Sequence, residues 1–413
     1  MSGSVFLDFR RVFSRRWAVG PANRFAEYVG QPVFVAIVVC MAFLAKERES
    51  TLPAFSNAFF YFTGLYAFWV GLFGSCQSIN SEVQNGEWSY WTLGLRRSIS
   101  HHVTAVFGVN LVCAIWNVLL FLAVVVSVSG YLSVHRGFNP FVSVFLTTNS
   151  AAADSLWQCG YVLKPLLIAK FGVFGPLIFA TAIYALSLFA AVLCGVCFGM
   201  LFSAVFRDPS VSLNASVAFV VLLGMLSLLG LQGDKSRSGS REVKSLDRGF
   251  APLFEARRDR NGETESKATA VDVLVSFSRI LPQRYFFNIA RLPAEKDISD
   301  RARKTIESEL ERIAGTNGND DSVWWRKNVP IMTNLGWASW DLMPPSDPNN
   351  MDDLAAEILS HSGFDDRHGI PYYWSLIRRA ILAELLPLVF MCIACLFSVN
   401  VCVLTIPTYR QLR

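Results

Sequence analysis

The chain has 413 residues, of which 53% are hydrophobic and only 17% charged, and its formal net charge is +5. A soluble globular chain usually carries about 25% charged residues, so the composition argues against a soluble fold. The net charge is modest, and the sequence contains no patch of basic residues typical of nucleic-acid binding. The charges concentrate between about Gly233 and Arg379, and several long runs elsewhere are almost free of them. About 20 apolar residues cross a bilayer core as a helix, and lipid offers the backbone no hydrogen-bond partner. The long runs therefore predict membrane-spanning helices.

Residues 1–27 are predicted to form an amphipathic helix at the membrane interface. An aromatic stripe recurs at intervals of three or four residues: Phe6, Phe9, Phe13 and Trp17. Four arginines lie mostly off that stripe: Arg10, Arg11, Arg15 and Arg16. Such a helix turns its aromatic side toward the acyl chains and its basic side toward anionic headgroups. The alternative is an ordinary amphipathic helix packed on protein. The arginines are not followed by a short apolar core and a cleavage site, so no signal peptide is predicted.

The next region, residues 28–232, is predicted to hold five spans, and a sixth lies within residues 376–413. The six apolar runs are 28–45, 54–78, 103–132, 166–206, 211–231 and 380–406. The fourth run is long for one helix, and Gly172, Gly175 and Pro176 interrupt its start, which predicts a bent lead-in before a single span. If it held two spans instead, the region after the fifth run would change sides of the membrane. The fold class is therefore an all-α polytopic membrane protein with six predicted transmembrane helices.

Arginines predict the orientation of these spans. They cluster in the N-terminal segment, between the second and third runs (Arg96, Arg97), after the fourth run (Arg207) and in the tail (Arg410, Arg413). Six spans put all four clusters on one side, which the positive-inside rule makes cytoplasmic, together with both termini. Arg378 and Arg379 disagree, because they fall at the outer end of the last span.

Residues 233–375 are predicted to form a large extracytoplasmic insertion between the fifth and sixth spans. Its first part, 233–272, is rich in charged and small polar residues, which is typical of disorder. The stretch 273–292 turns apolar but carries Arg279, Pro282 and Arg284, so it is predicted to be interfacial or re-entrant rather than spanning. Residues 297–314 have a helical apolar stripe. Four tryptophans follow: Trp324, Trp325, Trp337 and Trp340. They belong either to a surface for a partner or substrate, or to a small loop-rich core or a domain that rests on the membrane surface.

The sequence carries few signs of chemistry. Two C-x-x-C pairs, Cys194/Cys197 and Cys392/Cys395, lie inside apolar runs. They are interpreted as small packing residues, with a metal or redox site as the alternative, because no histidine or carboxylate accompanies them and a zinc site needs four ligands. No phosphate-binding loop, H-E-x-x-H or G-x-S-x-G motif is present. We therefore expect no enzyme activity, no metal and no cofactor bound by this chain itself.

One polar segment, residues 79–102, stands out between the second and third runs. It combines acidic, glycine and aromatic residues with a basic end: Glu82, Asn85, Gly86, Glu87, Trp88, Arg96 and Arg97. It resembles the coupling region of type-2 ATP-binding-cassette (ABC) permeases, the exporter fold shared with the ABCG class. The segment departs from that family's pattern at Val83, Trp88 and Leu95. The turn Arg207-Asp208-Pro209 resembles the family's connection between the fourth and fifth spans, and Leu281-Pro282-Gln283-Arg284-Tyr285 resembles its Leu-Pro-x-x-Tyr motif.

The resemblance implies a permease subunit of an ABC exporter in a bacterial cytoplasmic (inner) membrane. ATP and Mg²⁺ would be held by a separate ABC ATPase subunit, and a second permease subunit, identical or different, would complete the path. The 79–102 segment and the Arg207–Pro209 turn would couple the two kinds of subunit. In that family the second and fifth spans line the path, which here implies an apolar or amphipathic cargo near Tyr61, Phe62, Tyr66, Trp69, Ser212 and Ser216. The alternative interpretation is a membrane scaffold that displays the 233–375 region to an extracytoplasmic partner.

Overall fold

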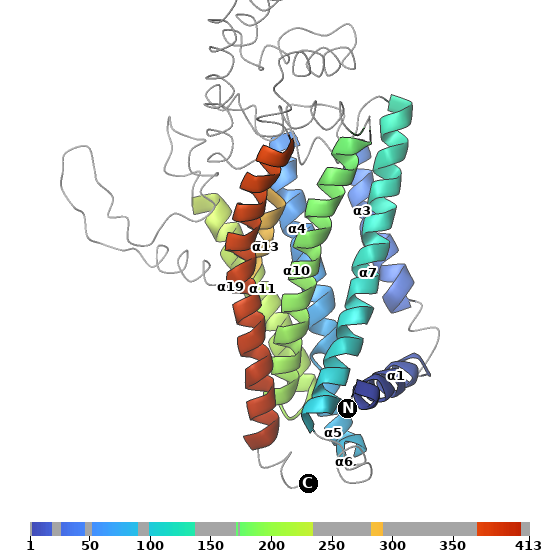
Figure 1. The fold of residues 1–413 in the computed structure, drawn as a ribbon, viewed down its shortest axis with the longest axis vertical. Helices are drawn as coiled ribbons and strands as arrows, with labels where there is room; N and C mark the ends of the chain where they lie inside the picture. The colour runs from blue at the N-terminus through green and yellow to red at the C-terminus, as the bar shows by residue number, and fades with distance from the viewer. Residues whose placement is uncertain are drawn as a thin grey trace, which may run out of the picture.

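The protein is all-helical in the part of the chain that the computed structural model describes, residues 2–18, 26–45, 52–89, 99–136, 171, 174–233, 282–291 and 370–405 (Figure 1). The elements in chain order are α1 (Ser2–Ala18), the π-helical turn η1 (Ala26–Gly30), α3 (Gln31–Ala45), α4 (Leu52–Ser75), α5 (Ser78–Gln84), α6 (Glu87–Ser89), α7 (Ile99–Arg136), α10 (Gly175–Val205), α11 (Pro209–Gly233), α13 (Pro282–Arg291) and α19 (Ile370–Thr405). The predicted all-α class is confirmed for these residues.

The long helices α3, α4, α7, α10, α11 and α19 form an elongated bundle (Figure 1). Within the described ranges, three segments are long and apolar enough to cross a membrane: Ile99–Tyr131, Leu177–Val205 and Ile381–Thr405. Shorter apolar helices cover Ala26–Met41 and Pro209–Met225. The class defined by this fold is thus an all-helical protein of the kind embedded in membranes. The helices α5 and α6, the α10–α11 turn and the last residues of α19 lie at one end of the bundle, hereafter the α5 end (Figure 1).

Several helix boundaries differ from those expected. Helix α10 begins at Gly175, with Pro176 in its first turn, where the missing N–H of a proline costs the helix no hydrogen bond. Helix α19 begins at Ile370, about ten residues before the predicted span, so Arg378 and Arg379 are exposed residues of its early turns. The start of α19 lies at the opposite end of the bundle from α5 (Figure 1). The two arginines therefore stay at odds with the positive-inside pattern.

Helices α4 and α10 form the most extensive contact in the bundle, and glycines make it close. A Cβ at Gly195 would overlap the carbonyl oxygen of Phe68, and one at Gly199 would overlap that of Leu72. On α4, a Cβ at Gly71 would lie 2.5 Å from the carbonyl oxygen of Val192. Gly195 and Gly199 form a G-x-x-x-G pair, the spacing that lets membrane helices approach backbone to backbone. Nothing larger than glycine fits at these three positions, so α4 and α10 pack backbone to backbone.

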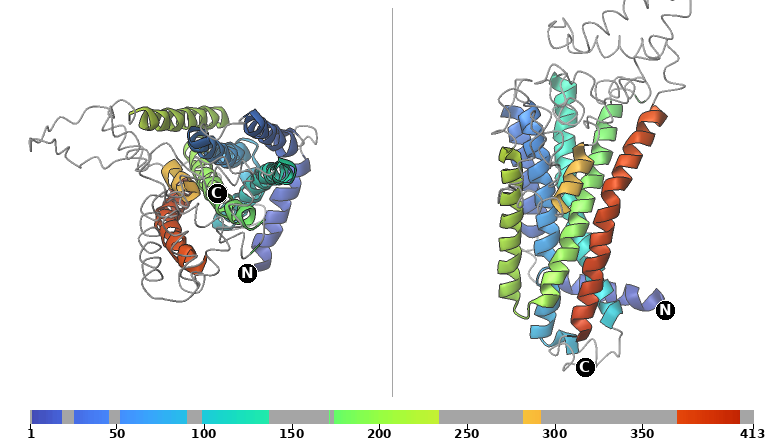
Figure 2. Two further views of the ribbon diagram at one scale, coloured as in Figure 1. Left: turned by 90° about the horizontal axis from the view of Figure 1, so that it is seen from above. Right: turned by 90° about the vertical axis from the view of Figure 1, so that its left-hand side faces the viewer.

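The ten-residue helix α13 lies against α10, α4 and α19 (Figure 2). The Ser187 hydroxyl of α10 donates to the Phe286 carbonyl at 2.6 Å, and the Gln283 amide donates to the Leu223 carbonyl of α11 at 3.2 Å. The Phe286 ring stacks on Phe68 and fills the space beside Gly64, where a Cβ would lie 2.9 Å from the ring. This part of the predicted insertion is therefore integrated into the helical core.

Helix α1 lies across the bundle axis near the α5 end and packs on α7 (Figures 1 and 2). Phe9 and Phe13 stack on one another and contact the small cluster of Tyr28, Val109 and Cys113. Phe6, by contrast, is exposed, as are Arg10 and Arg11. Phe9 and Phe13 of the predicted aromatic stripe therefore pack on protein, which is the alternative considered above, whereas Phe6 remains free to meet an interface.

Several predicted features lie outside the described residues. These are the part of the 1–27 segment from residue 19 to 25, the 233–272 stretch beyond its first residue, the 297–314 helix, the four tryptophans from 324 to 340, and the tail after residue 405.

Candidate functional site

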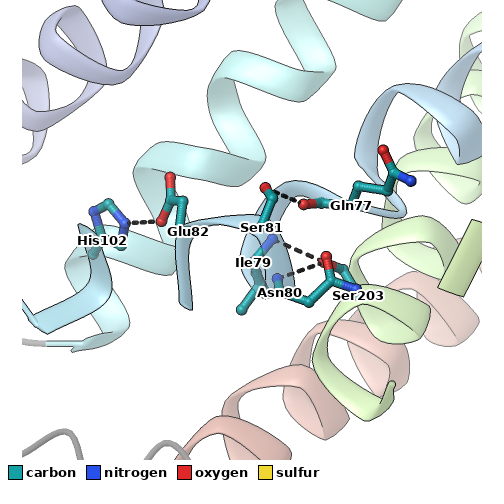
Figure 3. A network of polar contacts seen from close by, with 7 residues as sticks. All are labelled: Gln77, Ile79, Asn80, Ser81, Glu82, His102 and Ser203. Atoms are coloured by element: carbon teal, nitrogen blue, oxygen red, sulfur yellow. Dashed lines mark hydrogen bonds and ion pairs between the residues drawn. The ribbon is translucent and has the colours of Figure 1, made fainter. Parts of the chain in front are cut away.

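The start of α5 is held by a serine from a distant helix. The first residues of a helix have backbone N–H groups without partners inside it, and Gln77, the residue that precedes α5, provides no side-chain cap. The Ser203 hydroxyl of α10 fills that role, because it accepts the N–H groups of Ile79 at 2.8 Å and Asn80 at 3.1 Å (Figure 3). It also donates to the Asn80 side-chain oxygen at 3.3 Å. Both Ser203 and Asn80 are completely buried.

Three more hydrogen bonds tie the same region to the α10–α11 turn. The Asn80 amide donates to the Phe206 carbonyl at 3.3 Å, and the Gln77 amide donates to the Pro209 carbonyl at 3.1 Å. The Ser212 hydroxyl of α11 donates to the Cys76 carbonyl. These bonds join segments that are more than 120 residues apart in the sequence. We call this set the junction: Cys76, Gln77, Ile79, Asn80, Ser203, Phe206, Pro209 and Ser212.

The α10–α11 turn is itself well defined. Phe206 adopts an extended backbone that ends α10. Asp208 precedes α11 and caps its start: its carboxylate accepts the Ser210 N–H at 2.9 Å and its carbonyl accepts the Ser212 N–H at 3.0 Å. A carboxylate at a helix start also suits the helix dipole. Arg207 and Asp208 are exposed at the tip of this turn.

Glu82 and Trp88 make contacts inside the protein. The Glu82 carboxylate lies 2.6 Å from the Nε2 atom of His102 on α7, and the Glu82 side chain is only 14% exposed (Figure 3). The Trp88 ring is fully buried and meets the His102 ring edge to face, with ring centres 5.6 Å apart. These three side chains fasten α5 and α6 to the start of α7. The sequence alone suggested Glu82 and Trp88 as contact residues for a partner, whereas their contacts in this chain are internal.

The exposed part of this region is the turn between α5 and α6. Gln84, Asn85 and Gly86 are exposed, and Glu87 is half-buried. Gly86 has φ +73°, a conformation that residues with a side chain rarely adopt, and this explains a glycine at the tip. Together with Arg207 and Asp208, these residues form the exposed face of the α5 end. Arg96 and Arg97, also predicted to belong here, lie outside the described residues.

The residues predicted to line a path do not share one surface in this chain. Phe62 and Trp69 on α4 are 60% and 44% exposed, whereas Tyr66 is buried against Phe121 of α7 with ring centres 5.5 Å apart. For Tyr61, only the backbone position on α4 is described.

The two serines predicted for the path are buried in the first turns of α11. The Ser216 hydroxyl donates to the Ser212 carbonyl at 2.8 Å, and the Ser212 hydroxyl is engaged in the junction. Within this chain, their polar groups therefore serve helix contacts.

Gln77, Asn80 and Ser203 are site residues that the sequence alone does not predict. Nothing in a single sequence pairs a serine near the end of one apolar run with a helix start 124 residues away. Among the described residues, no group of three or more histidine, cysteine or acidic side chains is arranged to hold a metal ion.

Comparisons of the chain with protein-family models, with curated proteins and with solved structures gave no match.

Proposed function

We propose that the chain is the membrane-spanning permease subunit of an ABC exporter. In this proposal the helices α3, α4, α7, α10, α11 and α19 are its six spans, and the α5 end faces the cytoplasm of a bacterium. A separate ATPase subunit binds ATP and Mg²⁺ and docks on the α5 end. A second permease subunit completes the path for an apolar or amphipathic cargo.

The observation that supports this proposal most strongly is the junction. Two separate segments of the sequence resemble ABC coupling elements, residues 79–102 and the Arg207–Pro209 turn. The start of the first segment is hydrogen-bonded to the end of α10, just before the turn, through Ile79 with Ser203 and Asn80 with Phe206. Gln77, just before the first segment, donates to Pro209 in the turn itself. A docking element that has to transmit force needs such a connection, because an isolated loop would bend instead of moving the spans.

The proposed transmission follows the contacts. Movement of the ATPase subunits displaces the exposed turn at Asn85 and Gly86. Helix α5 passes this displacement to the ends of α10 and α11 through the junction. Because α4 leads directly into α5 and packs backbone to backbone on α10, the two helices move together as one body. Rigid-body movement of such a unit is the kind of motion that alternating access requires.

The docking contacts fall to the exposed residues of this end, and the buried ones position them. Asn85, Gly86, Arg207 and Asp208 are exposed to a partner. Glu82 and Trp88 act as positioning residues, because their contacts with His102 fix the angle of α5 and α6 against α7. Charged groups on the rim of an interface typically control the rate and specificity of association.

The test is affinity purification of the chain from its native membrane in mild detergent. We expect a protein with a phosphate-binding loop to co-purify and to hydrolyse ATP. The variant Arg207→Glu reverses an exposed charge at the α5 end and should lower this co-purification at least several-fold. Arg378→Glu reverses an exposed charge in the early turns of α19 and serves as the matched control, with unchanged co-purification expected. Recovery of an extracytoplasmic partner without any ATPase would contradict the proposal and support the scaffold instead.

A further inference from the structure

Two C-x-x-C pairs meet between α10 and α19. Residues three apart share one face of a helix, so Cys194 and Cys197 form one thiol face on α10, and Cys392 and Cys395 form another on α19. Helix α10 packs against α19 and the two faces come together, with the Sγ atoms of Cys194 and Cys392 3.4 Å apart. Cys392 also interacts with the thiol of Cys197.

This arrangement is more specific than packing alone requires. Small apolar residues such as alanine would fill similar space. Cys40 and Cys113 are also buried, but they lie on α3 and α7 and so do not belong to this cluster. Within the described ranges, neither histidine nor a carboxylate joins the four thiols to form a group that could hold a metal ion. Thiols in contact, without such ligands, are suited to forming a bond with each other.

We propose that Cys194 and Cys392 form a reversible disulfide between α10 and α19, instead of serving only as packing residues. The bond would tie the last long helix covalently to the closely packed α4–α10 pair. The proposal does not depend on the ATPase partner, so it can fail or succeed independently of the proposed function.

The geometry allows this bond with little movement. A disulfide joins its sulfur atoms at about 2.05 Å, so the two Sγ atoms, now 3.4 Å apart, have to approach by roughly 1.4 Å. Rotation of the side chains and a small shift of α19 suffice, because α19 packs mainly on α10 and α13 and exposes much of its remaining surface.

The oxidant we propose is a lipid-soluble quinone. The two S–H bonds break, one S–S bond forms, and the two electrons and two protons reduce the quinone to its quinol. Cys392 and Cys395 keep a small exposed fraction, 5% and 8%, on an apolar helix, so a lipid-soluble reagent can reach the cluster from α19. Cys194 and Cys197 are fully buried, which keeps water-soluble oxidants away.

The test uses the full chain in membranes, with a protease site inserted between Ser238 and Gly239. After treatment with a short-tailed ubiquinone analogue and cleavage, the two fragments should stay linked on a non-reducing gel and separate when a reductant is added. Cys392→Ala should abolish the link. Cys194→Ala should leave a weaker link through Cys197, and mass spectrometry should identify each pair.

The matched control is Cys113→Ala, which removes a buried cysteine of α7 that lies outside the cluster and should leave the link intact. Fragments of the wild-type chain that separate without a reductant after quinone treatment would overturn the proposal. A link that persists in Cys392→Ala would overturn it as well, because the cross-link would then involve other cysteines.

Discussion

Replacing Ser203 by alanine removes the hydroxyl that holds the start of α5 and changes little else. Ser203→Ala leaves the N–H groups of Ile79 and Asn80 without this acceptor, and the Asn80 side-chain oxygen without this donor. Ile79, Asn80 and Ser203 are all completely buried. The substitution therefore tests the junction without adding bulk or charge.

The expected magnitude follows from the number of groups that lose a partner. Loss of a helix-capping side chain typically costs about 1 kcal/mol, and a buried polar group left without a hydrogen bond costs about 1–3 kcal/mol. Since two amides share one acceptor here, we expect the attachment of α5 to weaken by about 2–3 kcal/mol. That corresponds to a roughly 30- to 150-fold increase in local opening, since each 1.4 kcal/mol is a factor of ten.

Hydrogen exchange measures this opening directly. In the purified chain, the amides of Ile79 and Asn80 should exchange faster by that factor in Ser203→Ala, while the middle of α7 stays protected. Ser398→Ala is the matched control, because the exposed Ser398 hydroxyl donates to the Ala394 carbonyl of its own helix. Unchanged exchange at the start of α5 in a folded Ser203→Ala variant would refute the capping role of Ser203.

Two further substitutions test the contacts around the junction. Gly199→Val should force α4 and α10 apart, because its Cβ would overlap the Leu72 carbonyl. Overpacking of this kind costs about 1–3 kcal/mol or more, so the midpoint of thermal unfolding should fall. Gly224→Val is the control and should leave that midpoint nearly unchanged, because the space around its new Cβ is open. Glu82→Ala removes the carboxylate that faces the buried His102 ring and should destabilise the α5–α7 contact by about 1–3 kcal/mol. Glu82→Gln keeps an acceptor for His102 and should retain most of that stability in the same thermal measurement; equal losses in both variants would count against the hydrogen bond.

The helices were largely predictable, because long apolar runs leave a chain few alternatives. Helices α7 (Ile99–Arg136) and α11 (Pro209–Gly233) contain their predicted runs, 103–132 and 211–231, and extend only slightly beyond them. The start of α19 was not predicted, since residues 370–379 include arginines that end an apolar run without ending a helix. Hydropathy indicates which residues prefer lipid, whereas helix boundaries depend on backbone hydrogen bonds that continue past them.

The candidate site was predictable only in part. The sequence marked Asn85, Gly86 and the Arg207–Pro209 turn, which are exposed or lie at the tip of a turn. The inward direction of Glu82 could not be inferred from the sequence, because it depends on His102, which the fold brings near only in three dimensions. The spacing of Gly195 and Gly199 was available in the sequence and would have indicated a close helix contact.

Photo-crosslinking from the α5 end tests whether an ATPase subunit docks there. A photoreactive amino acid is placed at Asn85 or at Asp208, both exposed at that end, and at the exposed Arg378 in the early turns of α19 as the control. We expect an adduct with a nucleotide-binding subunit from Asn85 and Asp208, and none from Arg378. Adducts with such a subunit from Arg378 alone, or none from the α5 end in membranes that contain the subunit, would contradict it.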